Sequence, residues 1–131
     1  MSPQTRLLSA ALIVFGVVFC LIYPLALNWP AGWAWHSGSP ASSDYFMMIV
    51  GVYATLGVFL IRAAREPAAH ASLIWFTVWS SVVHAGIMTA QSLRQPAQHG
   101  HLFGDVPALL LVALVLGVLM NRSSATSAAV V

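Results

Sequence analysis

Four stretches of the chain carry almost no charge and are long enough to cross a bilayer. They cover about residues 7–27, 45–64, 71–93 and 102–120. A transmembrane helix needs about 20 consecutive apolar residues, because the hydrocarbon core of a bilayer is about 30 Å thick. The third stretch contains a single ionisable side chain, His84, near its middle. This pattern predicts four membrane-spanning helices.

A polar stripe follows one face of the third predicted helix. At about 100° per residue, one arc of roughly 100° holds Thr77, Ser80, Ser81, His84, Met88 and Gln91. Trp75, Trp79 and Gly86 fall on the opposite face. Polar side chains are costly against lipid, so we expect the stripe to face other helices of the protein.

The segment from residue 28 to residue 44 is rich in Pro, Gly and Ser, which predicts a loop. Trp29, Trp33 and Trp35 in this loop are typical of an aromatic belt at the membrane interface. An aromatic platform for a ligand is the alternative. A serine or aspartate at positions 42–44 is suited to cap the next helix.

The connection between the second and third stretches, residues 62–70, is short. Two helices joined in this way are expected to be antiparallel neighbours. Gly51 and Gly57 mark thin patches on the second helix, where another helix of the chain or of a second copy can approach closely. On the same helix, Tyr53 either turns its hydroxyl toward the polar stripe or only packs.

The composition agrees with a membrane protein. The chain is 60% hydrophobic and 6% charged, and it has no lysine, whereas soluble domains carry about 25% charged residues. The lipid bilayer is therefore the expected partner, and a net charge of +2 gives no indication of nucleic acid. The predicted fold class is all-α, an integral membrane up-and-down four-helix bundle formed by one domain, residues 1–131.

The arginines predict the orientation of this bundle. Arg6, Arg62, Arg65 and Arg122 fall on one side of the predicted spans, and Arg94 falls on the other. Because positively charged loops stay in the cytoplasm, both termini are expected to be cytoplasmic. The two loops that contain tryptophan and histidine would then face outward.

The outward loops gather six charged or titratable side chains near one mouth: His36, Asp44, Arg94, His99, His101 and Asp105. His101 and Asp105 are four residues apart and share a face if the fourth helix begins early enough. His84 would lie about 13 Å below, at ~1.5 Å of rise per residue. The sequence therefore predicts an outward-opening polar shaft, and its candidate ligand or proton-site residues are His84, Gln91, His101, Asp105, Ser81 and Tyr53.

Three interpretations of this shaft stay open. The polar groups could be structural, since interhelical hydrogen bonds of about 0.6 kcal/mol are common in membrane proteins. They could form a ligand or proton site in which Asp105 tunes His84. They could bind a metal through His99, His101 and His36 with Asp44 or Asp105, although an H-G-H loop without a further motif is a weak signal. Haem would need an axial pair, and only His84 is deep enough.

Several stretches resemble a family of small, uncharacterised bacterial four-helix membrane proteins that is broadly similar to the DoxX-like group. The resemblance covers roughly residues 20–120 and rests on the W-P-x-G-W-x-W-H loop and on Gly51–Leu60, Ala63–Pro67, His70–His84 and His99–Leu110. It implies a multi-pass protein of the bacterial inner (cytoplasmic) membrane. Some DoxX-like relatives are associated with quinone or thiol redox chemistry, but no redox motif in this chain carries that association onto a residue.

The functional expectation is a small inner-membrane protein of unassigned activity, acting as an accessory or partner-binding subunit. The alternative is a carrier or redox-associated component whose outward pocket surrounds a buried histidine. No catalytic residue is predicted, because Cys20 has no base nearby in sequence and no nucleophile motif is present. Whether the protein is an enzyme, whether it forms a homo-oligomer and which cofactor it uses are left open.

Overall fold

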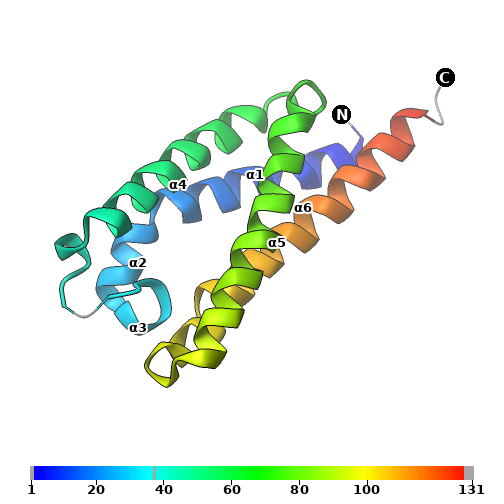
Figure 1. The fold of residues 1–131 in the computed structure, drawn as a ribbon. Helices are drawn as coiled ribbons and strands as arrows, with labels where there is room; N and C mark the ends of the chain where they lie inside the picture. Colours follow the sequence, from blue (N-terminus) through cyan, green and yellow to red (C-terminus); the bar gives the residue numbers. More distant parts are fainter. Residues whose placement is uncertain (1, 37, 129–131) are drawn as a thin grey trace.

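The computed structural model describes residues 2–36 and 38–128, with side chains up to residue 124. This part of the chain is helical and contains no strand (Figure 1). In chain order the elements are α1 (Pro3–Cys20), α2 (Ile22–Asn28), α3 (Pro30–Trp33), η1 (Pro40–Ser42), α4 (Asp44–Ala63), η2 (Pro67–His70), α5 (Ala71–Arg94), η3 (Pro96–Leu102) and α6 (Asp105–Ala128). The three η elements are short 3₁₀ helices.

Four helical segments in the described part of the chain are long and apolar enough to cross a membrane: Pro3–Cys20, Asp44–Ala63, Pro67–Arg94 and Pro96–Ser124. This confirms the prediction of an all-helical chain with four candidate spans. The bounds of α4 and α5 agree with the predicted second and third stretches to within one residue. The fourth helix is longer than predicted, because α6 continues through the small polar residues after position 120.

The first stretch is interrupted, so the prediction of one continuous helix over residues 7–27 is wrong. α1 begins at Pro3, whose ring suits the first helical position. It ends at Cys20, and Leu21 separates it from α2. The cause is Pro24, which has no N–H to donate to the Cys20 carbonyl and whose ring clashes with that carbonyl. The chain therefore changes direction here, and α2 leads into the short helix α3.

The long helices pack in two pairs, α1 along α4 and α5 along α6, and contacts between α1 and α6 join the pairs (Figure 1). The expectation that the second and third spans pack as neighbours is therefore wrong: η2 joins α4 to α5 at one end, and each helix packs on a different partner. Glycine residues allow α4 to pack closely on α1. A Cβ on Gly16 would lie 2.7 Å from the Gly57 carbonyl oxygen, so the backbones of α1 and α4 are in contact.

The side-chain distribution suits a protein that is surrounded by lipid. Many large apolar side chains are exposed on the spanning helices, among them Trp79, at 63%. Conversely, Thr77, Ser81 and Met88 of the polar stripe are buried against other helices. A stripe of hydroxyl groups inside and an apolar surface outside is the arrangement expected in a bilayer.

α1 begins and α6 ends at the same end of the molecule, and the connection that contains η2 lies there too (Figure 1). This end carries Arg6, Arg62, Arg65 and Arg122, whereas Arg94 closes α5 at the opposite end. The segments around α3 and η3 also lie at the opposite end. The clustering of arginines thus has a structural counterpart, and the direction of the molecule across a membrane stays a prediction.

Candidate functional site

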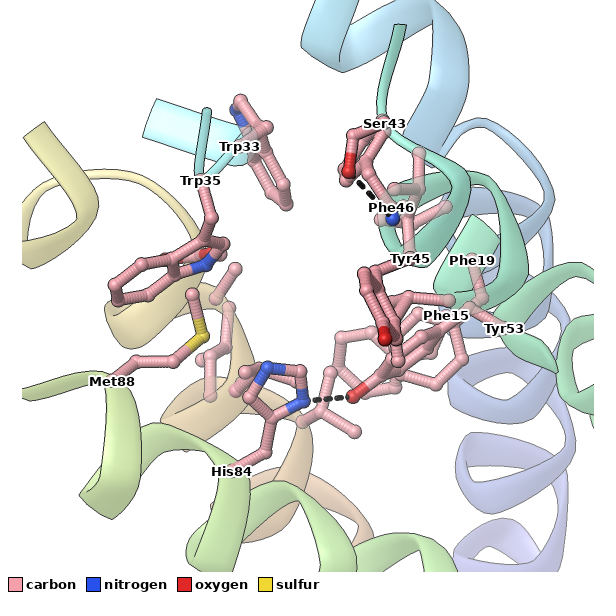
Figure 2. Close-up of a pocket in the computed structure, with 18 of the residues that line it drawn as sticks. Phe15, Phe19, Trp33, Trp35, Ser43, Tyr45, Phe46, Tyr53, His84 and Met88 are labelled. Atoms are coloured by element: carbon pink, nitrogen blue, oxygen red, sulfur yellow. Dashed lines mark hydrogen bonds between the residues drawn. The ribbon is translucent and has the colours of Figure 1, made fainter. Parts of the chain in front are cut away.

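A cavity of about 690 Å³ lies between the two helix pairs, at the end opposite to the termini. Its walls come from α1, α4, α5 and α6 and from the segment that contains α3. Trp33, Trp35 and Met88 lie on one side of the space in Figure 2, and Tyr45 and Phe46 lie across from them. The lining is therefore mostly aromatic and aliphatic, with a few polar groups among these side chains.

The floor of the cavity, as drawn in Figure 2, is a hydrogen bond between Tyr53 of α4 and His84 of α5. The Tyr53 hydroxyl lies 2.5 Å from His84 Nδ1, and the edge of the Phe19 ring packs against Tyr53. The His84 tautomer decides the direction of this bond: the Tyr53 hydroxyl donates to an unprotonated Nδ1, or a protonated Nδ1 donates to the hydroxyl oxygen. In either tautomer the other ring nitrogen, Nε2, points toward the open space (Figure 2).

A second polar pair lies at the cavity wall where α6 begins. His101 Nδ1 lies 2.9 Å from Asp105 Oδ2, and His101 Nε2 lies 3.2 Å from the Ala34 carbonyl oxygen. Since a carbonyl only accepts, Nε2 is the donor to Ala34. The Nδ1–Oδ2 contact needs one further proton, so the pair is either an imidazolium and a carboxylate or a neutral imidazole and a carboxylic acid. The Trp35 indole stacks on the His101 ring at 4.0 Å, as a cation–π contact would.

Close backbone packing of α3 on the segment around η3 positions this pair. A Cβ on Gly104 would meet the Gly32 carbonyl group, and a Cβ on Gly100 would meet the Ala31 carbonyl group. Only glycine allows these approaches. They bring the Ala34 carbonyl within reach of His101 and turn Trp35 toward the bundle.

The two carboxyl oxygens of Asp105 differ in their hydrogen bonding. Its Oδ2 is bound to His101, whereas its Oδ1 is buried and has no hydrogen-bond partner among the described residues. The residue is 8% exposed and lines the cavity.

Among the candidate residues from the sequence, Tyr53, His84 and Asp105 line the cavity. His101 does not line it but lies behind Asp105, and it is 1% exposed. Ser81 is buried between helices, away from the cavity. The expected shaft therefore reduces to a mainly apolar cavity, in which Tyr53, His84 and Asp105 are the candidate residues that reach the walls.

Gln91 is exposed and outside the cavity, which corrects the expectation that it would line a shaft above His84. The buried face of α5 passes through Ser81, Ala85 and Ser92, because α5 packs on α6 and η3. At about 100° per residue, His84 and Gln91 lie at the edge of this face. α4 closes that edge at the level of His84, through Tyr53, whereas Gln91, nearer the end of the helix, is exposed.

The weak metal candidates do not come together in the described part of the chain. His36 lines the cavity, with its Nε2 2.8 Å from the Ser39 carbonyl oxygen. His99 is exposed, His101 is bound to Asp105, and Asp44 begins α4. No group of three or more His, Cys, Asp or Glu side chains in the described residues is placed to hold a metal ion.

Trp33 and Trp35 line the cavity, although the sequence pattern indicated this role only as an alternative. Both lie in a segment that is typical of an interfacial belt, yet both side chains line the cavity. Trp29 alone of the three is well exposed, at 43%. The aromatic-platform alternative describes the positions of Trp33 and Trp35 better than the belt does. Only the long-range contacts of α3 with η3 reveal this.

Comparison with known proteins gives a family and no activity. A family model described as a family of unknown function, DUF6632, matches residues 2–130. No curated protein and no solved structure matches the chain. The match spans all four candidate membrane helices and every residue of the cavity. The chain therefore belongs to the DUF6632 family, whose function is unknown.

Proposed function

We propose that this protein is a membrane carrier or binding subunit that holds one lipophilic molecule in the cavity between its helix pairs. The observation that supports it is the space itself: about 690 Å³ of mostly apolar lining, with Tyr53 and His84 joined across the floor. Ligand sites typically have volumes of about 300–1,000 Å³, apolar walls and a few placed polar groups. The cavity matches this description in size and in chemistry.

The rim of the cavity favours a ligand that comes from the bilayer. Val14 of α1, Tyr45 of α4 and Leu111 of α6 line it and are also exposed on helices that are long enough to span a membrane. A molecule dissolved in lipid therefore reaches the cavity sideways, without crossing a polar surface. In the proposed setting, a four-helix bundle in a bacterial inner membrane with cytoplasmic termini, the cavity lies in the outer half of the bilayer.

A purely structural role for the polar groups accounts for less of the geometry. Hydrogen bonds that only hold helices together need no open space beside them, whereas His84 Nε2 faces the open space of the cavity (Figure 2). An accessory subunit without a ligand would use the exposed apolar surface, but lipid covers that surface equally well. The DoxX-like resemblance stays a prediction, and the assignment of a carrier does not depend on it.

Filling the cavity tests the proposal. Ala108 of α6 lines it, and Ala108→Phe places a ring in the space. Ala90 of α5 is exposed and lies outside the cavity, so Ala90→Phe is a matched control. Native mass spectrometry of protein extracted from its own membranes in mild detergent measures what remains bound.

The expected result is one lipophilic adduct per chain on the unmodified protein and on Ala90→Phe, and at least a tenfold smaller population on Ala108→Phe. Circular dichroism establishes that both variants are folded. Equal adduct populations on the two variants, or no discrete adduct on the unmodified protein after addition of membrane lipid extract, would contradict the proposal.

A further inference from the structure

A second cleft lies at the end of the molecule where α1 begins and α6 ends, opposite to the cavity between the helix pairs. It has a volume of about 560 Å³ and is lined by Arg62, Arg65, Glu66 and His70. Arg62 lies in the last turn of α4, Arg65 and Glu66 lie in the turn that follows, and His70 ends η2 (Figure 1). All four side chains are exposed, so the cleft is open to a ligand from outside the protein.

The guanidinium groups of Arg62 and Arg65 are unpaired in the described part of the chain. Neither group makes an ion pair or a hydrogen bond there. Glu66 lines the same cleft but pairs with neither arginine. Two guanidinium groups and one carboxylate leave one net positive charge, so the cleft matches an anion with a single negative charge.

The surface next to the cleft is apolar and exposed. Val58 and Phe59 precede Arg62 by four and three residues, so the three side chains lie on one face of α4. Val58 and Phe59 are each 51% exposed, on a helix that is long and apolar enough to span a membrane. An amphiphile whose polar group binds the arginines therefore finds an apolar surface for its chains on the same helix.

A structural role accounts for only part of this arrangement. A cation in the last turn of a helix interacts favourably with the helix dipole, which explains Arg62. Arg65 follows the end of α4, where this effect falls off. Orientation across a membrane depends on the number of positive charges on one side and does not require that two of them line one cleft.

We propose that this cleft binds the phosphate group of an anionic phospholipid with one negative charge, of the phosphatidylglycerol type, whose acyl chains lie against Val58 and Phe59. Guanidinium groups form strong, often paired hydrogen bonds with phosphate oxygens. A zwitterionic lipid matches the cleft less well, because its own cation would lie near the two arginines. The inference does not depend on the proposed function, since the cleft and the cavity share no residue and lie at opposite ends.

The test compares two lipids with the same acyl chains on the purified full-length protein after bound lipid has been removed. Dioleoylphosphatidylglycerol and dioleoylphosphatidylcholine are titrated in mild detergent, and native mass spectrometry identifies each adduct by its mass. We expect one saturable phosphatidylglycerol adduct with an affinity at least tenfold higher than that for phosphatidylcholine, because each arginine near an anionic headgroup contributes to binding.

Substitutions locate the adduct. Arg62→Gln combined with Arg65→Gln is expected to weaken phosphatidylglycerol binding at least tenfold. Arg94→Gln is the matched control, because Arg94 is exposed at the opposite end of α5, and it is expected to retain the affinity. Glu66→Gln removes the competing negative charge and is expected to strengthen binding severalfold. Ala108→Phe, which fills the cavity, is expected to leave this adduct unchanged.

Four outcomes would overturn the proposal. These are equal affinities for the two lipids, an equal loss on Arg94→Gln and on the double variant, loss of the adduct on Ala108→Phe, and equally tight binding of glycerophosphoglycerol. The last compound is the headgroup without acyl chains, so its binding would assign the cleft to a soluble phosphate compound. The comparison of the lipids needs no substitution, and circular dichroism establishes that each variant is folded.

Discussion

Replacing His101 by phenylalanine tests whether the pair with Asp105 is the polar centre of this end of the molecule. The substitution keeps a ring against Trp35 but removes the hydrogen bonds to Asp105 and to the Ala34 carbonyl. Both oxygens of Asp105 would then lack a partner in a residue that is 8% exposed. The control is His99→Phe, two residues away on η3, where the side chain is exposed.

The magnitude follows from the group that is left behind. Removing one member of a buried ion pair costs about 3–5 kcal/mol, whereas neutral interhelical hydrogen bonds in membranes average about 0.6 kcal/mol. We expect His101→Phe to lower the free energy of unfolding by about 2–3 kcal/mol, less than for a fully buried ion pair, because the Asp105 side chain is 11% exposed. For His99→Phe we expect a change within about 0.5 kcal/mol, as for other exposed positions.

The assay is unfolding in mild detergent with increasing sodium dodecyl sulfate, followed by circular dichroism. A second substitution tests whether the unpaired carboxyl group causes the loss. Adding Asp105→Leu to His101→Phe removes that group and is expected to raise the free energy of unfolding by at least about 1 kcal/mol relative to His101→Phe alone. If the double variant is less stable than His101→Phe alone, or if His101→Phe and His99→Phe behave alike, the pair does not stabilise the fold in the way described.

Two further predictions concern packing and orientation. Gly57→Leu is expected to destabilise the protein by about 1–3 kcal/mol in the same assay, because its Cβ would meet the backbone of α1. Gly51→Leu, where nothing lies within 4 Å, is expected to be neutral, and equal effects would contradict the contact between α1 and α4. In a cysteine-free background, Ser39→Cys is expected to react with a membrane-impermeant maleimide from outside intact spheroplasts, and Ala68→Cys only after permeabilisation. The reverse labelling would place the cavity on the cytoplasmic side.

The elements that the sequence predicts well are those that depend on local chemistry. α5 matches its predicted stretch because one long apolar run determines both its ends. Ser43 caps α4, with the Phe46 N–H donating to its Oγ at 3.2 Å, as the cluster of polar residues before the run suggests. The break at Leu21 is also local and could have been predicted from Pro24, which stands four residues after the last carbonyl of α1.

The pairing of the helices depends on contacts that no local pattern contains. A short connection shows that α4 and α5 run in opposite directions, but it does not determine which helix each packs against. Gly57 is visible in the sequence as a thin position, and its partner could have been a second copy of the chain. In the structure the partner is Gly16, so this patch is used inside the molecule.

In the candidate site, too, some features follow from local sequence and others depend on tertiary contacts. His101 and Asp105 are four residues apart, which predicts their contact, although His101 lies in η3, before α6 begins. Tyr53 could be predicted to reach His84 only as one of two alternatives, because its rotation about α4 is set by tertiary packing. The positions of Trp33 and Trp35 depend on how the loop folds back, which the sequence pattern does not encode.

The contact between α3 and η3 has a consequence for what the molecule can admit. Both segments are loops in the sequence, and they belong to different helix pairs, which diverge toward this end. The packing of glycine residues against backbone carbonyl groups in this contact sets the distance between the two helix pairs at this end. That distance sets the width of the cavity between them. A few loop residues at one end of the molecule would then determine the width of a cavity whose other walls are spanning helices.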